Sequence, residues 1–336
     1  DLLYPAFATV IMLFFMFLLL RRLFDWRVAL LSVLITNIST AFLFRSLSSD
    51  HDILGMMFLM MTFYFIVVGW QSKSAKKAFF FGFLASISTA LGKWTAGIIL
   101  FAFIVIGIFT LLEIFLNKFE DIDYFVLLGW LLPFSIYSII FPKLGGILQY
   151  LTSVTTSVAY LALLTAIVHQ IIKKRDLFKI KSKLQNKFPE GIFSFLISLS
   201  FAVLLRIIYQ GFGFFKWLVN EFYGLLFTFI STSRWALTVA ESRRSYVVDW
   251  FGNFGSLYVY IFIIGSVILF YHAFRNIPKA KWFSGIYILF IVPYILARYS
   301  QSHKILNGSS TLSRFMLVGS VTLFLSVSVF FYLKYC

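Results

Sequence analysis

Apolar runs of about twenty residues recur along almost the whole of this chain, and they limit the folds that it can adopt. A helix needs about 20 predominantly apolar residues to cross the hydrocarbon core of a bilayer. Of the 336 residues, 61% are hydrophobic and only 12% are charged, which is more apolar side chain than a soluble domain can bury. The runs lack the alternating pattern of ~10-residue segments that marks a transmembrane barrel. The sequence therefore predicts an all-α, polytopic helical membrane protein.

We expect about eleven spans, with boundaries defined to within ~2–4 residues. They are 3–20, 28–45, 53–70, 78–92, 95–117, 124–141, 148–171, 191–209, 256–274, 280–298 and 315–334. A further apolar run, 211–230, carries Lys216, Asn220 and Glu221 near its middle. We interpret it as an interfacial or re-entrant part of a long external loop, 210–255, because irregular backbone at membrane depth needs cover from protein or a watery cavity. The alternative is that it spans, which would move Glu241 to the membrane face opposite Asp50.

Basic residues crowd every second loop. The net charge is +16, which in a soluble chain would suggest a nucleic-acid partner, but here no nucleic acid is expected. The richer set of loops holds Arg21, Arg22, Arg27, Lys73, Lys76, Lys77, Lys118, Lys173, Lys174, Arg175, Lys179, Lys181, Lys183, Lys187, Arg275, Lys279 and Lys281. The positive-inside rule makes these loops cytoplasmic. The sequence therefore predicts a multi-pass protein of the cell membrane whose other loops face the extracytoplasmic side.

Two short acidic clusters lie on that outer side. Asp50, His51 and Asp52 precede one apolar helix, and Thr238-Val-Ala-Glu241 precedes a later one. In an extended loop residues i and i+2 point the same way, so Asp50 and Asp52 are candidate ligands for one hard cation, Mg²⁺ or Mn²⁺. The alternatives are ordinary: an aspartate can cap the following helix, and Thr-x-x-Glu is a capping-box pattern. The single cysteine, Cys336, excludes a disulfide framework and a cysteine-based zinc site.

The residues after Glu241 make a resemblance specific. The run from Thr238 to Gly255, which includes Asp249-Trp250 and Phe254-Gly255, resembles the external loop of the oligosaccharyltransferase catalytic subunit in its archaeal form. The 50–52 cluster is similar to that family's second Asp-x-Asp-type motif. Two weaker matches are Lys93-Trp-Thr-Ala-Gly97, which resembles a Trp-Gly-Gly-Tyr-like stretch, and Ser313-Arg-Phe315, which resembles the Arg-Phe that opens a late span.

The resemblance implies a GT-C-type glycosyltransferase transmembrane domain over 1–336, truncated at both ends. The family has thirteen spans, so the first span, the first external loop with its own Asp-x-Asp, and the soluble domain that reads the acceptor are expected to lie outside this chain. We expect the chain alone to be inactive. The implied catalytic residues are Asp50, Asp52 and Glu241, and the implied metal ligands are Asp50 and Asp52.

The same resemblance assigns substrate-binding roles to Arg314, Arg243, Arg244 and Trp94. A guanidinium suits the phosphate of a lipid carrier. The alternatives remain open. Arg314 can be an anchor that snorkels to the membrane interface, and Arg243 and Arg244 can be solvated charges of the loop. Lys93 and Trp94 can anchor their helix at the interface.

The implied function is the transfer of an oligosaccharide from a polyprenyl phosphate or pyrophosphate carrier to asparagine in Asn-x-Ser/Thr sequons. The partners would be that carrier, an acceptor polypeptide and the lipid bilayer, with the enzyme acting as a single subunit. A different polyprenyl-phosphate-sugar-dependent glycosyltransferase, such as a protein mannosyltransferase, is the first alternative. A lipid or solute transporter is less favoured, because the carboxylates lie at span ends and no internal repeat is evident.

Overall fold

The computed structural model describes residues 4–38, 52–116, 118–141, 146–175 and 190–211, with the single residues 213, 216 and 261. The chain divides into two compact units, the first formed by residues 1–38 and 42–214 and the second by 39–41 and 215–336. All five described ranges belong to the first unit. The architecture below is that of this unit.

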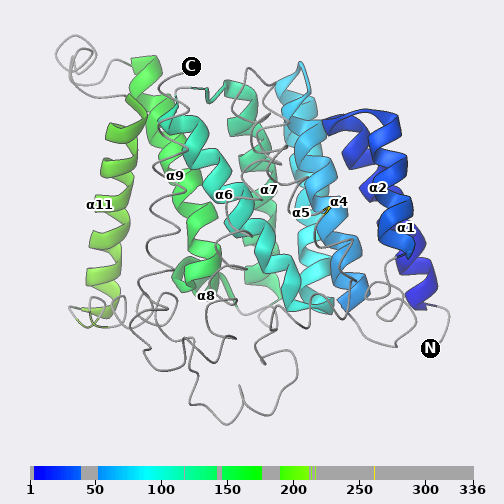
Figure 1. Ribbon diagram of the computed structural model, residues 1–336. Helices are drawn as coiled ribbons and strands as arrows, with labels where there is room; N and C mark the ends of the chain where they lie inside the picture. Colours follow the sequence, from blue (N-terminus) through cyan, green and yellow to red (C-terminus); the bar gives the residue numbers. More distant parts are fainter. Residues whose placement is uncertain are drawn as a thin grey trace, which may run out of the picture. The chain divides into compact units, whose positions relative to one another are not determined.

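Helices make up the regular structure of the described part. They are α1 (Tyr4–Leu23), α2 (Trp26–Ile38), α4 (Asp52–Trp70), α5 (Ala75–Thr95), the 3-10 turn η1 (Gly97–Ile99), α6 (Leu100–Phe115), α7 (Asp121–Ile140), α8 (Gly146–Thr152), α9 (Val154–Arg175) and α11 (Glu190–Gln210). The long helices stand side by side (Figure 1). Six segments of this part are long and apolar enough to cross a membrane: Tyr4–Leu23, Asp52–Trp70, Gly97–Phe115, Asp121–Ile140, Thr156–Lys173 and Glu190–Tyr209. The prediction of a helical, multi-pass membrane protein is therefore confirmed for the part of the chain described.

A helix lies at each of the first eight predicted spans, although residues 39–45 of the span 28–45 lie outside the described residues and one other span needs correction. We expected 148–171 to be a single span. The structure ends α8 at Thr152 and begins α9 at Val154, so that the chain turns at Ser153 before the long helix starts. Within the short helix, Tyr150 is 3% exposed and its ring packs on Phe103 and Phe134. The last three predicted spans, 256–274, 280–298 and 315–334, lie outside the described residues, as does the question of whether 211–230 spans.

Small residues decide which helices approach most closely. On α5, Gly82 faces Gly129 of α7, and a Cβ atom on Gly82 would meet the Val126 carbonyl oxygen and lie 3.0 Å from the Trp130 backbone nitrogen. A Cβ atom on Gly129 would meet the Phe79 carbonyl oxygen in return. Helices in a bilayer associate through such close backbone packing, because lipid offers no hydrophobic drive between them. The glycine pair therefore brings α5 against α7, and α5 also packs on α4.

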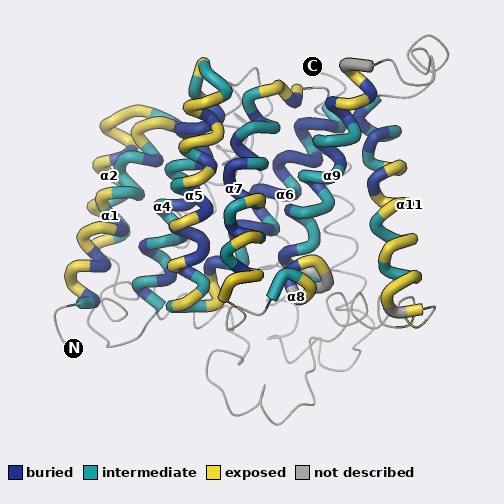
Figure 2. The backbone as a smooth tube through the Cα atoms, turned by 180° about the vertical axis from the view of Figure 1, so that it is seen from behind, coloured by how far each residue is buried: buried dark blue, intermediate teal, exposed yellow. Residues whose placement is uncertain are grey.

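A second seam joins α6, α9 and α11. A Cβ atom on Gly107 of α6 would lie 2.8 Å from the Ala159 backbone nitrogen of α9, and one on Gly191 of α11 would meet the Ile114 carbonyl oxygen of α6. The helices at the two flanks of the unit are less covered: α1, α2 and α11 carry most of the exposed surface in Figure 2. On α11, Ile208 is 80% exposed and Tyr209 is 63% exposed. Apolar side chains exposed on a spanning helix are suited to contact lipid.

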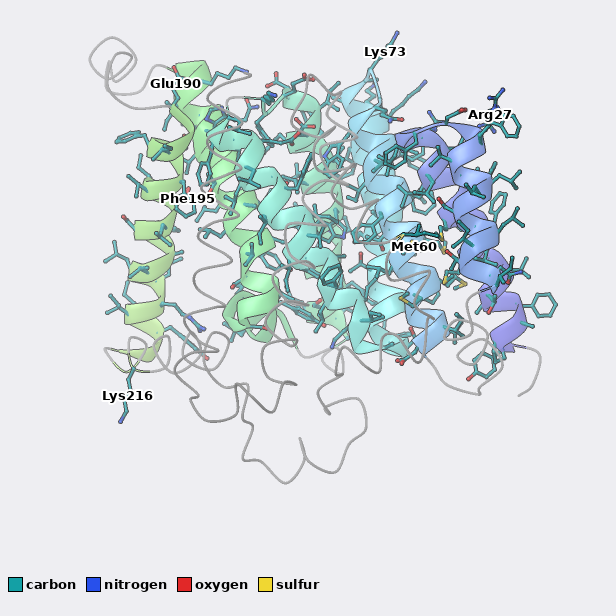
Figure 3. All side chains as sticks on the ribbon, in the orientation of Figure 1. Arg27, Met60, Lys73, Glu190, Phe195 and Lys216 are labelled. Atoms are coloured by element: carbon teal, nitrogen blue, oxygen red, sulfur yellow. The ribbon has the colours of Figure 1, made fainter. Side chains whose placement is uncertain are left out.

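The two ends of the unit separate the charged residues as the sequence predicts. Arg27, Lys73 and Glu190 lie at one end (Figure 3). Because α4 ends near Lys73 and α5 begins beyond it, the start of α4 and the end of α5 lie at the opposite end. Asp52 and Trp94 therefore share an end that the richer set of basic loops does not occupy.

Candidate functional site

The described part of the candidate site is the end of the unit where α4 begins and α5 stops. Asp52 is the first residue of α4 and is half-buried. A carboxylate in the first turn interacts favourably with the helix dipole, so this position fits the capping alternative. The same carboxylate oxygens also fit a hard cation such as Mg²⁺ or Mn²⁺. Asp50, its expected co-ligand, lies outside the described residues.

The interruption between α5 and η1, at Ala96, packs tightly against the beginning of α4. Ala96 ends α5 in an extended conformation, and the Thr95 hydroxyl donates a 2.9 Å hydrogen bond to the Gly92 carbonyl. A Cβ atom on Gly55 would lie 2.6 Å from the Ala96 Cβ and 2.8 Å from Ile98 Cγ2. Gly55 lies less than one turn from Asp52, so the first turn of α4 is held directly beside the end of α5.

Trp94 lies on the other side of that helix end. Its ring centroid is 5.8 Å from those of Tyr137 and Phe141 of α7, which are 4.6 Å from each other. Trp94 is 55% exposed, so a large part of the indole remains open. The structure thus brings Asp52 and Trp94 to the same end of adjacent helices, with the end of α5 between the first turn of α4 and α7. An exposed tryptophan at a helix end is also typical of a membrane-interface anchor.

The other predicted site residues are Glu241, Arg243, Arg244 and Arg314, and all of them lie outside the described residues. Their proposed roles stay predictions. Among the residues that the structure does describe, no group of three or more His, Cys, Asp or Glu side chains is arranged to hold a metal ion.

Sequence reasoning missed a buried polar chain in the middle of the unit. The indole Nε1 of Trp130 donates a 2.8 Å hydrogen bond to Thr89 Oγ1, and Thr89 Oγ1 lies 3.3 Å from Thr62 Oγ1. All three side chains are fully buried. The chain joins α7, α5 and α4, the three helices that carry Trp94, its aromatic partners and Asp52. Its only sequence signal is hydroxyls and an indole within apolar runs, which does not reveal that they meet.

A second set of polar contacts lies at the opposite end, where α6 and α9 stop and α7 and α11 begin. Gln170 donates a 2.7 Å hydrogen bond from Nε2 to Asp121 Oδ1, which links α9 to α7. His169 Nδ1 lies 3.4 Å from Ser194 Oγ, which links α9 to α11. The Ser194 hydroxyl also donates a 2.9 Å hydrogen bond to the Glu190 carbonyl of its own helix. These contacts bind helices together and are far along the helix axes from Asp52.

In comparisons with known proteins, part of this chain matches a family model, and its fold matches that of solved structures. Residues 2–140 match the model for dolichyl-phosphate-mannose-protein mannosyltransferase. A comparison with curated proteins gives no match. Two solved structures of oligosaccharyltransferases from Archaeoglobus fulgidus, the first of them AglB, share the fold. One is in complex with an inhibitory peptide and a dolichol-phosphate, with a TM-score of 0.63 and 17% identity. The other is the apo form, with a TM-score of 0.66 and 16% identity.

Both matches cover 98% of this chain and 39% of the oligosaccharyltransferase chain. The chain therefore spans about two fifths of the length of those proteins. It is a multi-pass helical membrane protein with a GT-C-like fold. The resemblance to the archaeal oligosaccharyltransferase, expected from the motifs, is confirmed at the level of the fold.

Proposed function

We propose that this protein contributes the membrane part of an enzyme that transfers an oligosaccharide from a polyprenyl phosphate or pyrophosphate carrier to asparagine in Asn-x-Ser/Thr sequons. The observation that carries the proposal is the fold match over 98% of the chain to an archaeal oligosaccharyltransferase. The sequence adds support, because Asp50-His-Asp52 and Thr238-Val-Ala-Glu241 occur in the order that the resemblance to the oligosaccharyltransferase catalytic subunit implies.

The chemistry explains why carboxylates are needed. A carboxamide nitrogen is a poor nucleophile because its lone pair is delocalised into the carbonyl. Glu241, together with the aspartate of the first external loop that the resemblance implies, would accept hydrogen bonds from the N–H groups of the acceptor amide, which localises that pair and holds the nitrogen near the anomeric carbon of the sugar. A positioned hydrogen-bonding group of this kind typically contributes ~2.7–4 kcal/mol to the stabilisation of a transition state.

The leaving group is a phosphate, so positive charge is needed beside it. Asp50 and Asp52 would hold Mn²⁺ or Mg²⁺, which supplies electrostatic stabilisation of the departing phosphate. Arg314, with Arg243 or Arg244, would hold phosphate oxygens through charge-assisted hydrogen bonds. Trp94, at the same end as Asp52, would border the region occupied by the carrier. The active site would face the extracytoplasmic side.

A second candidate is transfer of a single mannose from dolichyl phosphate to a serine or threonine hydroxyl. The match of residues 2–140 to the mannosyltransferase model favours it. The run that begins with Thr238-Val-Ala-Glu241 favours the first candidate, because its resemblance to the external loop of the oligosaccharyltransferase catalytic subunit is specific. The two functions differ in donor and acceptor, so one assay separates them.

The assay uses the full-length protein in membranes, with lipid-linked sugar donors and two labelled peptides. One peptide carries an Asn-x-Thr sequon and the other carries the same residues with glutamine in place of asparagine. We expect glycan on the sequon peptide only. Glu241→Gln and Asp50→Asn should each reduce that transfer by at least 100-fold, which is the size of a lost positioned charge.

The matched control is Asp25→Asn, because Asp25 lies at the opposite end of the unit from Asp52, in the turn between α1 and α2, and should leave transfer unchanged. Transfer to serine or threonine in both peptides would favour the mannosyltransferase. Normal transfer by both Glu241→Gln and Asp50→Asn would contradict the proposed roles of these residues.

A further inference from the structure

The methionines of this chain are not spread along it. Six of the seven, Met12, Met16, Met56, Met57, Met60 and Met61, lie on α1 and α4, and only Met316 lies elsewhere. They form three pairs four residues apart: Met12 with Met16, Met56 with Met60, and Met57 with Met61. Residues four apart share a helix face. Each pair therefore presents two thioether sulfurs on one side of its helix.

The two helices run parallel, and their relative height follows from contacts at two levels. The ring of Phe15 is 5.5 Å from that of Tyr64, and Gln71 Nε2 donates a 3.4 Å hydrogen bond to the Arg22 carbonyl. Both contacts join residues 49 apart in sequence, so a residue of α1 lies level with the α4 residue 49 positions later. Met12 is then level with Met61, and Met57 lies one turn away, about 6 Å along the axis.

Packing brings these sulfurs into the same interface. Met12 is 2% exposed and Met57 is 7% exposed, and both belong to one buried cluster with Ala8 and Ile53. Met61 and Met60 pack against that cluster. Figure 3 shows sulfur atoms gathered near Met60, between α4 and α1.

We propose that Met12, Met57 and Met61 form a binding site for a soft monovalent cation, Cu(I) or its analogue Ag(I), between α1 and α4. Thioether sulfur is a neutral, soft ligand that selects Cu(I) over hard cations. The three rotatable bonds of methionine let the sulfurs converge without moving the helices. Asp52 lies in the first turn of α4, and its negative charge attracts a cation toward this end of the helix. This site is separate from the one in the proposed function, which uses oxygen ligands.

The ordinary explanation of these methionines is that they fill irregular gaps in an apolar interface. The experiment separates the two explanations because leucine fills the gap but cannot bind the ion. The full chain carrying Cys336→Ser, which removes its single thiol, is purified in detergent and titrated with Cu(I) in competition with a chromophoric Cu(I) chelator. We expect one Cu(I) per chain.

The triple variant Met12→Leu, Met57→Leu, Met61→Leu should bind Cu(I) at least tenfold more weakly, and the matched control Met316→Leu should bind it as tightly as the parent. X-ray absorption of the parent should show sulfur ligands only. Helix content and thermal unfolding establish that each variant is folded, and Met57→Leu alone serves if the triple variant is not. Absence of stoichiometric Cu(I) binding, equal binding by the leucine variants, or nitrogen and oxygen ligands in the spectrum would each overturn the proposal.

Discussion

The indole of Trp130 and the hydroxyl of Thr89, 41 residues apart in sequence, meet through a 2.8 Å hydrogen bond between α7 and α5. Thr89 also donates to the Ala85 carbonyl of its own helix at 2.8 Å, so its oxygen serves as acceptor and donor at once. In a structure surrounded by lipid no water can replace a lost partner. The pair therefore holds together two of the helices that end at the candidate site.

Thr89→Val should destabilise the protein by about 1–2 kcal/mol, because it leaves the buried Trp130 Nε1–H without its acceptor. Unfolding in mixed micelles measures the change. Thr110→Val is the matched control, since Thr110 is equally buried and, within the described part of the chain, its hydroxyl bonds only to the Ile106 carbonyl of its own helix. Equal effects of the two substitutions would show that the contact between α5 and α7 contributes nothing of its own.

Gly82→Ala should destabilise by about 1–3 kcal/mol, as overpacking does when the atoms in the way belong to backbone. The added Cβ would meet Val126 and Trp130 main-chain atoms that cannot move without shifting α7. Gly97→Ala is the control, because no atom of the residues that the structure describes lies within 4 Å of its added Cβ. Thermal unfolding of both variants checks the expectation, and a loss of stability in Gly97→Ala alone would contradict it.

Tyr150 should resist ionisation. Burial, and secondarily the charge of Tyr160, raises the pKa of Tyr150 to about 12 from its ordinary value of 10.0. Because the raised pKa belongs to the folded state, its contribution to stability is complete below pH 10 and is lost as the pH rises toward 12. Ultraviolet titration of the parent minus Tyr150→Phe should show a phenol that ionises near pH 12. A difference titration centred near pH 10 would mean that Tyr150 is not buried.

The orientation of the unit predicts which cysteines a membrane-impermeant maleimide can reach. In a Cys336→Ser background, Trp94→Cys should be labelled on intact cells, and Lys73→Cys should be labelled only after permeabilisation. Both positions are exposed, so accessibility within the protein does not limit the reaction. The reverse pattern would place Asp52 and Trp94 on the cytoplasmic side and contradict the proposed extracytoplasmic active site.

The sequence predicted the spanning helices well because hydropathy and length are local properties. The run from Ile53 to Trp70 has to be helical in a bilayer whatever its neighbours are. The break at Ser153 falls in a hydroxyl-rich stretch, Thr-Ser-Val-Thr-Thr-Ser at 152–157, whose residue types favour helix ends, and the count of apolar residues passed over that signal. The ring of Tyr150 in α8 packs on Phe103 of α6 and Phe134 of α7, and the sequence of 148–171 does not reveal these contacts. Asp52 and Trp94 were predicted to share a membrane face from the count of spans alone, and the structure places them at one end of the unit.

From the sequence alone, the class of protein, the spans of the described part and the loops that share an end could be determined, because each depends on the side chains of one short segment. Only the tertiary structure decided which helices are neighbours. A spanning helix is apolar on every side, so its pattern does not mark the face that meets protein. The roles of Gly82 and Gly129 in close packing become visible only when α5 and α7 lie together. The same is true of the hydrogen bond between Thr89 and Trp130 and of the shared burial of Met12 and Met57.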